Sequence, residues 1–307
     1  MKPAFRGGAV HARVPATSAN LGPGFDALGL ALALHDDVVA RVGEQGLSVQ
    51  VAGEGEAVAR DETHLVVRSM RVTFARLGGQ PRGLELSCTN RIPHGRGLGS
   101  SAAAIVAGVV LARALVVGGD EAMPDSGVLA LASSVEGHPD NVAACLLGGL
   151  TVAWDEHGSA RAIRAEVAGY VRPVVFIPPF ESDTARTRGL LPGSISHRDA
   201  TFNAGRSALL VAALAGGPDA LMAATEDRLH QRYRADCLPA TADLVARLRA
   251  SGLPAVVSGA GPSVLVLARG EVEVQRARAD CPEEWRCEPL AVDLHGAHLV
   301  PTAAPTG

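Results

Sequence analysis

Residues 92–108, IPHGRGLGSSAAAIVAG, restrict the possible folds of this chain more than any other stretch. Gly95, Gly97 and Gly99 stand at alternate positions, and the pair of serines and alanine-rich apolar run that follow predict a buried helix. Glycine allows positive φ and a close approach of the backbone to a ligand, while the free N–H groups and the dipole at a helix N-terminus attract anions. The segment therefore predicts a phosphate-binding loop that leads into a core helix.

This loop matches neither of two common phosphate-binding motifs. A Walker A loop ends in Gly-Lys-Ser/Thr and a Rossmann turn has the order G-x-G-x-x-G, whereas this loop reads G-R-G-L-G-S-S. Lys2 is the only lysine in the sequence, so backbone dipoles, arginine and a metal ion must neutralise the phosphates. Glycine-rich turns also precede helices that bind nothing, so the loop alone does not identify the function.

The composition limits the size and the partners of the protein. A chain of 307 residues with 47% hydrophobic residues is long enough for two domains, and a net charge of −4 predicts no general nucleic-acid surface. Residues 102–117 form the most apolar run, but Arg113 interrupts it and it is shorter than the roughly 20 residues of a membrane span. Five scattered cysteines without a C-x-x-C pair, and an N-terminus without a signal-peptide core, predict a cytoplasmic protein that is not bound to a membrane.

Hydrophobic periodicity predicts strands and helices in separate runs, which is typical of an α+β fold. The expected strands are 9–14, 38–42, 47–51, 83–88, 150–154, 171–177, 255–257, 264–268, 289–293 and 297–300. The expected helices are 62–77, 102–118, 128–135, 199–214, 219–233 and 240–251. The turn at 43–46 is a hairpin signal for the strands on either side. A domain boundary is expected between about 161 and 171.

Three glycine-marked segments, taken together and in this order, resemble the motifs of the GHMP kinases. They are PATSANLGPGFDALGLAL (15–32), IPHGRGLGSSAAA (92–104) and SGAGPSVLVLA (258–268), so the resemblance covers almost the whole chain. It implies the two-domain GHMP kinase fold of the α+β class. The N-terminal ribosomal-protein-S5-like α/β domain, with the ATP phosphate loop, would span 1–165, and the C-terminal ferredoxin-like α+β domain would span 166–307.

Three further segments resemble the homoserine kinases within this superfamily: EGHPDNVAACLLGGL (136–150), TARTRGLLP (184–192) and YRADCLP (233–239). The resemblance implies ATP-dependent phosphorylation of the side-chain hydroxyl of L-homoserine to O-phospho-L-homoserine, in threonine biosynthesis, with ATP and Mg²⁺. Another GHMP small-molecule kinase, with a mevalonate-type or shikimate-type acceptor, and a non-catalytic GHMP-fold ligand sensor stay open as alternatives. The oligomeric state also stays open, with a homodimer as one alternative.

The resemblance places the donor nucleotide on the glycine loop, whose backbone N–H groups would wrap the phosphates. Mg²⁺ would take one hard oxygen from Ser100 or Ser101, of which we assign Ser101, and another from Glu136. The residues assigned to ATP are Pro93, His94, Gly95, Arg96, Gly97, Leu98, Gly99, Ser100, Ser101, Ala102 and Ala103.

For the amino-acid substrate the resemblance assigns Asn20, Asp26, His138, Arg188 and Arg234. Asp26 would meet the substrate ammonium and Arg234 its carboxylate, which is chemically apt because a guanidinium binds a carboxylate through two parallel hydrogen bonds.

The catalytic residues implied are Asn141 and Arg188 on the γ-phosphate, with Asp140 as a participant that either takes part or orients its neighbours. No lysine is available for an Asp/Lys base pair. Direct in-line transfer without a strong general base is therefore expected, since a loose transition state depends on positioning and on charge stabilisation.

Several assigned side chains also have an ordinary structural explanation. Glu136 can be an exposed carboxylate at a helix end, Asp26 a turn or cap residue, and Arg188 and Arg234 solvated charges on helix faces. The other histidines show no metal-ligand spacing and are expected to be structural.

Overall fold

Two β-sheets organise the computed structural model, which describes residues 3–182 and 184–301. Within these residues the larger sheet has seven strands in the order β11-β1-β2-β4-β3, with β5 and then β6 attached to β2. Its strands are β1 (Val10–Ala19), β2 (Leu28–Gly43), β3 (Gly46–Gly53), β4 (Gly83–Asn90), β5 (Leu150–Glu156), β6 (Ser159–Ala165) and β11 (His298–Val300). The smaller sheet has the order β10-β7-β9-β8, with β7 (Val171–Ile177), β8 (Ala255–Val257), β9 (Val264–Arg269) and β10 (Arg286–Pro289).

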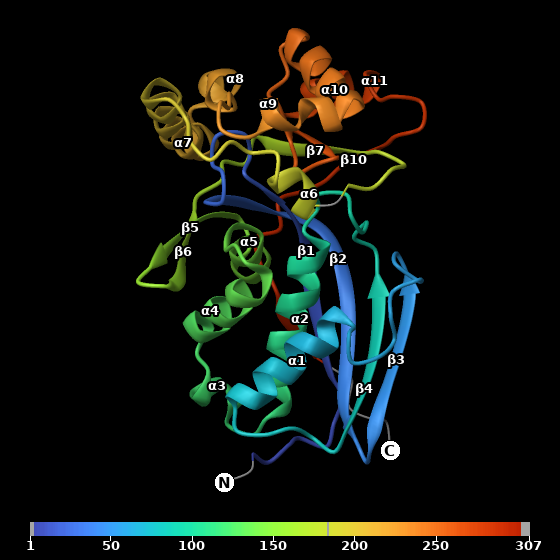
Figure 1. Ribbon diagram of the computed structural model, residues 1–307. Helices are drawn as coiled ribbons and strands as arrows, with labels where there is room; N and C mark the ends of the chain where they lie inside the picture. The colour runs from blue at the N-terminus through green and yellow to red at the C-terminus, as the bar shows by residue number, and fades with distance from the viewer. Residues whose placement is uncertain (1–2, 183, 302–307) are drawn as a thin grey trace.

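Helices cover one face of the larger sheet (Figure 1). They are α1 (Leu65–Arg76), α2 (Ser100–Leu115), α3 (Gly119–Ala122), α4 (Asp125–Glu136) and α5 (Asp140–Leu147). The predicted buried helix is confirmed as α2, which packs between α1, α4, α5 and β1. Its small residues permit this close packing, because a Cβ on Gly108 would lie 2.6 Å from the Val66 carbonyl oxygen of α1.

The second half of the chain forms a separate layer beside the end of α2 where the glycine loop lies (Figure 1). Its helices are α6 (Thr184–Arg188), α7 (His197–Gly216), α8 (Leu221–Ala224), α9 (Gln231–Arg234), α10 (Pro239–Ala250) and α11 (Glu271–Ala279). Val174 and Phe176 of β7 pack with Leu244 and Leu248 of α10 in a second hydrophobic core. The chain then returns to the first half, where β11 pairs with β1.

The predicted hairpin around 43–46 is wrong. The turn does connect β2 to β3, but β4 lies between the two strands, pairing antiparallel with β2 and parallel with β3. A turn signal reports only the local chain reversal, whereas the strand order depends on partners far along the sequence.

Other predicted elements differ in their extent. The first strand continues beyond its expected end, through Pro15, as far as Ala19. The register of its pairing with β2 shifts between Pro15 and Ala16, and this irregularity accommodates the proline within the strand. The helix expected at 219–233 is broken into α8 and α9. Asp227 causes the break, since its carboxylate accepts hydrogen bonds from the backbone N–H groups of residues 229, 230 and 231.

Two smaller strand predictions also change. The strand expected at 289–293 lies earlier, at β10, and Val292 contributes only an isolated bridge to Leu32. The sequence pattern missed β6, which pairs with β5 at the sheet edge and has an exposed, polar composition.

The α+β class is confirmed, with strands and helices in two layers around two cores. The division into 1–165 and 166–307 stays a prediction. In the described parts, 3–182 and 184–301, no helix combines the length and apolar character that crossing a membrane requires.

Candidate active site

The three glycine-marked segments of the sequence meet at the start of α2. Thr17 N–H donates to the Leu98 carbonyl at 3.0 Å, which joins the first segment to the glycine loop. Gly259 N–H donates to the Ala19 carbonyl at 3.1 Å, which joins the third segment to the first. The loop is therefore held between β1 and the β8–β9 turn, although these segments are far apart in the sequence.

The glycines of the loop are required by backbone conformation and by crowding. Gly97 and Gly99 have φ values of +72° and +71°, in the left-handed region. A Cβ on Gly97 would lie 2.4 Å from the Ser258 carbonyl oxygen, and a Cβ on Gly99 would lie 1.9 Å from Thr17 Oγ1. No side chain fits at either position without moving its neighbours.

The first turn of α2 faces the carboxylate at the end of α4. Ser101 Oγ donates to Glu136 Oε1 at 2.6 Å. The Glu136 side chain is only 10% exposed, so its interpretation as an exposed helix-end carboxylate is wrong. Burial raises the pKa of Glu136, and the Ser101 hydrogen bond opposes that rise. The pair places two hard oxygens beside the free N–H groups of a helix N-terminus.

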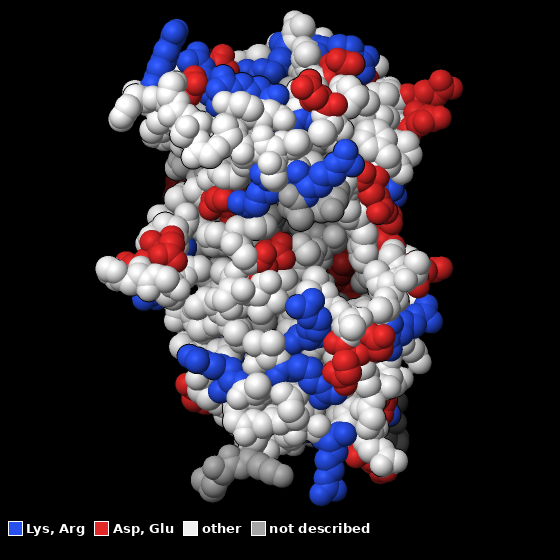
Figure 2. All heavy atoms as spheres, viewed as in Figure 1, with Lys and Arg blue, Asp and Glu red and all other residues white. Residues whose placement is uncertain are grey.

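A cavity of about 430 Å³ opens in front of this pair, between the two halves of the molecule. Figure 2 shows the surface hollowed at this level, with positive and negative side chains interspersed on the face in view. The side chains predicted for the substrate, for the metal and for catalysis all line this cavity. Its lining residues are Asn20, Asp26, Gly95, Gly97, Gly99, Ser100, Ser101, Glu136, His138, Asp140, Asn141, Ser182, Arg188, Arg234, Gly259 and Ala260.

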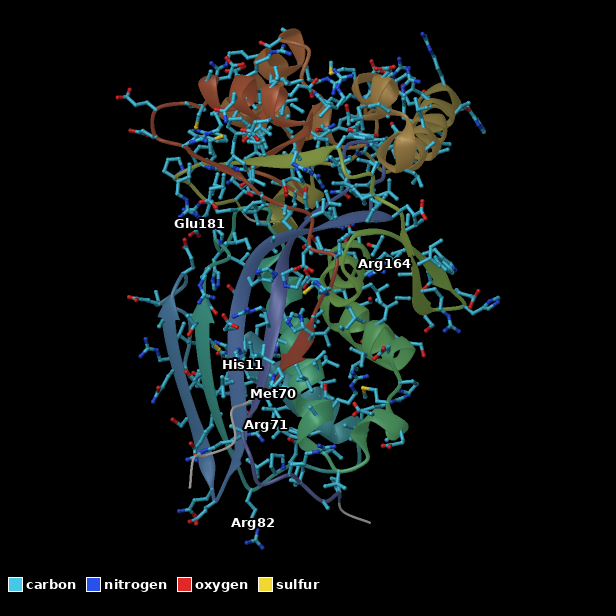
Figure 3. The ribbon with its side chains drawn as sticks, turned by 180° about the vertical axis from the view of Figure 1, so that it is seen from behind. His11, Met70, Arg71, Arg82, Arg164 and Glu181 are labelled. Carbon is cyan, nitrogen blue, oxygen red and sulfur yellow. The ribbon has the colours of Figure 1, made fainter. Side chains whose placement is uncertain are left out.

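The rest of the predicted ATP loop lies elsewhere. His94 and Ala103 line a second cavity, whereas Pro93, Leu98 and Ala102 are buried in the protein. Arg96 turns away from the cavity, and its guanidinium donates to the carbonyls of residues 178 and 179 at 2.8 Å. It also lies 3.1 Å from Glu181, which Figure 3 shows at the junction of the two halves. Arg96 thus ties the loop to the end of β7.

Asp26 and Arg188 bind each other across the cavity. Both guanidinium Nη atoms donate to the Asp26 carboxylate, at 2.8 and 2.7 Å. The Asp26 hydrogen bond is the main cause of a raised Arg188 pKa. Asn20 holds Asp26 in place, because Asn20 Oδ1 accepts from the Asp26 backbone N–H at 3.0 Å.

Arg234 is buried without an acidic partner. Arg234 is only 2% exposed. Among the described residues, no carboxylate lies within ion-pair distance of its guanidinium. Its interpretation as a solvated charge is therefore wrong. Burial, and then the nearby Arg188, lower the pKa of Arg234. Such an arginine is costly to bury unless an anion completes its environment.

The structure also brings His230 to this site, through its contact with Arg234. The sequence analysis expected this histidine to be structural only. His230 Nδ1 lies 2.8 Å from Arg234 Nη1, and its Nε2 lies 2.7 Å from the Gly22 carbonyl oxygen. Because an arginine only donates, Nδ1 accepts and Nε2–H donates to Gly22. His230 therefore fixes the orientation of the Arg234 guanidinium. The two residues are four positions apart in the sequence, and this spacing on a helix predicts that their side chains meet.

His138, Asp140 and Asn141 form a connected group at the start of α5. His138 Nδ1 lies 2.9 Å from Asp140 Oδ1, and this hydrogen bond raises the pKa of His138. Asp140 Oδ1 also accepts from the Asn141 backbone N–H at 2.8 Å. Asn141 Oδ1 in turn accepts from Thr17 Oγ1 at 2.8 Å, a contact that the sequence analysis missed.

The second cavity lies on the other side of the glycine loop and shares Gly95, Ser100 and Ser101 with the first. Apolar residues such as Val58 form much of its lining. His64 is only 8% exposed there, and its Nδ1 has no hydrogen-bond partner in the described structure. The sequence analysis missed this cavity and the position of His64 in it.

Within residues 3–182 and 184–301, no three or more His, Cys, Asp or Glu side chains are grouped as metal ligands. The Ser101–Glu136 pair fits a cation that receives its remaining oxygens from phosphates and water.

Comparisons with known proteins agree with this arrangement. The family model for the GHMP kinases N terminal domain matches residues 64–149, and that for GHMP kinases C terminal matches residues 209–287. A homoserine kinase of Streptomyces avermitilis is 59% identical over 98% of this chain and 99% of its own length. One from Clavibacter michiganensis is 50% identical over 94% of this chain and 93% of its own length.

Solved structures are similar over the same extent. A homoserine kinase from Cytophaga hutchinsonii superposes with a TM-score of 0.83 at 25% identity, covering 97% of this chain and 98% of that one. A putative homoserine kinase from Listeria monocytogenes gives a TM-score of 0.75 at 28% identity, covering 96% of this chain and all of that one. The expected fold is confirmed by these comparisons together with the two sheets.

Proposed function

This chain belongs to the GHMP kinases and, among them, to the homoserine kinases, and on that premise we propose how its cavity transfers a phosphoryl group from ATP to L-homoserine. One observation carries the proposal: a single cavity gathers the glycine loop, the Ser101–Glu136 oxygen pair and the buried Arg234, which has no acidic partner in the part of the chain that the structure describes. A donor with phosphates and an acceptor with a carboxylate can therefore lie side by side in it.

On the donor side, the backbone N–H groups of the glycine loop bind the phosphates of ATP. Ser101 and Glu136 would hold Mg²⁺, which would neutralise phosphate charge. The positive φ of Gly97 and Gly99 supports this role, because it lets consecutive N–H groups face one ligand.

On the acceptor side, Arg234 binds the carboxylate of homoserine through its guanidinium, which His230 has already oriented. Asp26 binds the ammonium. In the structure Asp26 is paired with Arg188, so the substrate ammonium takes the place of the Arg188 guanidinium. Arg188 then becomes free to bind the γ-phosphoryl group beside it. An acceptor with both charges uses both sites, which favours an amino acid over mevalonate or shikimate.

In the transfer step, Asn141 and Arg188 donate hydrogen bonds to the γ-phosphoryl oxygens while the homoserine hydroxyl attacks in line. The new O–P bond forms as the bond to ADP breaks, ADP leaves, and the hydroxyl proton passes to an oxygen of the transferred phosphoryl group. Asp140 orients His138 and the start of α5, and it takes no proton in this scheme. A loose transition state forms little bond to the acceptor oxygen before cleavage, so positioning and charge stabilisation replace a strong base.

We expect ADP release to depend on L-homoserine and on Mg²⁺. In a coupled assay with homoserine, mevalonate, shikimate and water as acceptors, homoserine stimulates ADP release strongly and chelation of divalent cations abolishes it. Shikimate and mevalonate carry the carboxylate for Arg234 but no ammonium for Asp26. Stimulation by either of them without stimulation by homoserine would reject the acceptor assignment and leave the fold unaffected. No acceptor-dependent release at all would favour the ligand sensor.

The second cavity receives the nucleoside of ATP, and His64 contacts the base there. Burial, and then the neighbouring His94, lower the pKa of His64, so its imidazole is neutral at neutral pH. Because Nδ1 is inaccessible to solvent, the Nε2 atom of this neutral imidazole, which lines the cavity, accepts a hydrogen bond from the amino group of adenine.

We therefore expect His64→Ala to raise the KM for ATP about tenfold, the value of one good hydrogen bond, with little change in kcat. The preference for ATP over ITP, which lacks that amino group, should narrow in the same variant. His197→Ala is the matched control, because His197 is exposed at the start of α7. An unchanged ATP-to-ITP ratio in the His64 variant would exclude this contact.

The cytoplasmic location, the homodimer and the domain division at 165 also stay proposals. The free state of Cys88 and Cys145, both buried, is compatible with a reducing compartment. Sedimentation of the purified chain measures the oligomeric state directly.

A further inference from the structure

Thr17 lies in β1 beneath the glycine loop, with its hydroxyl directed at Asn141. The residue is fully buried, at 0% exposure, and its Oγ1 lies 2.8 Å from Asn141 Oδ1 at the start of α5. The two residues are 124 positions apart, so only the folded protein brings them together.

Three elements hold the Thr17 hydroxyl in place. Thr17 pairs with Ala31 of β2, and its backbone N–H donates to the Leu98 carbonyl of the loop. Gly99 leaves the space for Oγ1, since a Cβ there would lie 1.9 Å from it. The side chain therefore has little freedom to rotate away from Asn141.

The contact decides which end of the Asn141 amide faces the cavity. A hydroxyl donates one hydrogen, and Asn141 Oδ1 is the acceptor that Thr17 Oγ1 meets in the described residues. If the amide were turned round, the buried hydroxyl hydrogen would lose this acceptor, which is unfavourable. With Oδ1 engaged, the amide NH₂ group has no protein partner in the described chain, and Asn141 lines the cavity.

We propose that Thr17 is a positioning residue for phosphoryl transfer: its hydroxyl holds the Asn141 carbonyl so that the Asn141 NH₂ group points at the γ-phosphoryl oxygens. The inference rests on the proposed role of Asn141. A reversed amide would direct a carbonyl oxygen at a negatively charged group, which repels it. Thr17 itself does not touch the substrate in this arrangement.

The test compares Thr17→Val, which keeps the branched shape and removes the hydroxyl, with Thr17→Ser, which keeps the hydroxyl. We expect Thr17→Val to lower kcat about 10- to 50-fold, with the KM values for ATP and homoserine within about twofold of the parent. Thr17→Ser should retain kcat within about threefold. Thermal unfolding of each variant confirms that it is folded, and Thr17→Ala provides the same comparison if the valine variant does not fold.

A double-mutant cycle with Asn141→Ala separates positioning from a general structural role. In the Asn141→Ala background, Thr17→Val should cause no further loss of kcat, because the amide that it positions is absent. An equal loss in both backgrounds, an unchanged kcat in Thr17→Val alone, or a loss in Thr17→Ser as large as in Thr17→Val would each overturn the inference. If Asn141→Ala itself keeps the parental kcat, the proposed role of Asn141 fails first, and the inference falls with it.

Discussion

Replacing Arg188 by alanine should lower kcat by roughly 10² to 10³, the loss seen when a donor to developing charge is removed from other enzymes. The KM for ATP should stay nearly unchanged, because the glycine loop and the second cavity, which we propose hold the nucleotide, bind it without Arg188. Steady-state kinetics at saturating ATP and homoserine measure both quantities.

The same variant also tests the exchange of partners at Asp26. Arg188→Ala leaves Asp26 without its bidentate partner, so the substrate ammonium no longer has to displace a guanidinium. Because the Asp26–Arg188 pair is partly exposed, with side chains 33% and 41% accessible, the gain is small. The KM for homoserine should therefore stay level or fall by a few-fold. A large rise would show that Arg188 binds the ground-state substrate, not the transferring group.

Two variants serve as controls for Arg188. Arg188→Lys keeps one positive charge but loses the planar fork, so we expect an intermediate kcat. Arg232→Ala removes an exposed arginine that contacts Asp199 outside the cavity, and kcat should be unchanged. Parental kcat in Arg188→Ala would remove this residue from the transfer step.

Local chemistry explains why the sequence alone predicted the loop and α2. Glycine permits the positive φ that Gly97 and Gly99 adopt, and the apolar run after them predicts a buried helix. Both properties belong to consecutive residues. The same is true of β7 and β9, whose apolar runs predicted strands.

Long-range contacts explain what the sequence could not predict. The insertion of β4 between β2 and β3 is decided by pairing across the sheet, and the turn at 43–46 carries no information about it. Thr17 lies in the first motif segment and His64 in none, but the sequence around each residue predicts no chemical role for it. The roles that we propose for them depend on neighbours such as Asn141, 124 residues away, or on a cavity that exists only after folding.

Arg234 and Glu136 show why the expectation of a solvated surface charge was wrong for two residues of the cavity. Arg234 on a short helix and Glu136 at a helix end have the sequence context of solvated charges. Both line the cavity between the two halves of the chain, where Arg234 is 2% exposed and the Glu136 side chain 10% exposed. Burial of unpaired charge is costly, and the substrate and the metal ion that we propose would offset that cost.

Gly99→Ala should lower kcat/KM by at least about 10², because a displacement of about 1 Å in a reacting group is enough for such a loss. The new Cβ would lie 1.9 Å from Thr17 Oγ1 and 3.1 Å from Asn141 Oδ1, so it pushes apart the contact that orients the Asn141 amide. The φ of +71° adds strain of roughly 1–2 kcal/mol for a residue with a side chain. Kinetics and thermal unfolding of the variant measure the two effects.

Two other glycines separate crowding from backbone strain. Gly158 has a φ of +79° with nothing within 4 Å of a new Cβ, so Gly158→Ala carries the strain alone and should keep full activity. Gly95→Ala, at φ +62°, places its Cβ 3.2 Å from the Cβ of Glu181, a much milder contact than the one of 1.9 Å at Gly99. Its activity should lie between those of the other two variants. If Gly99→Ala lost no more activity than Gly95→Ala, the crowding against Thr17 would have no catalytic consequence, and strain in the phosphate loop would account for both losses.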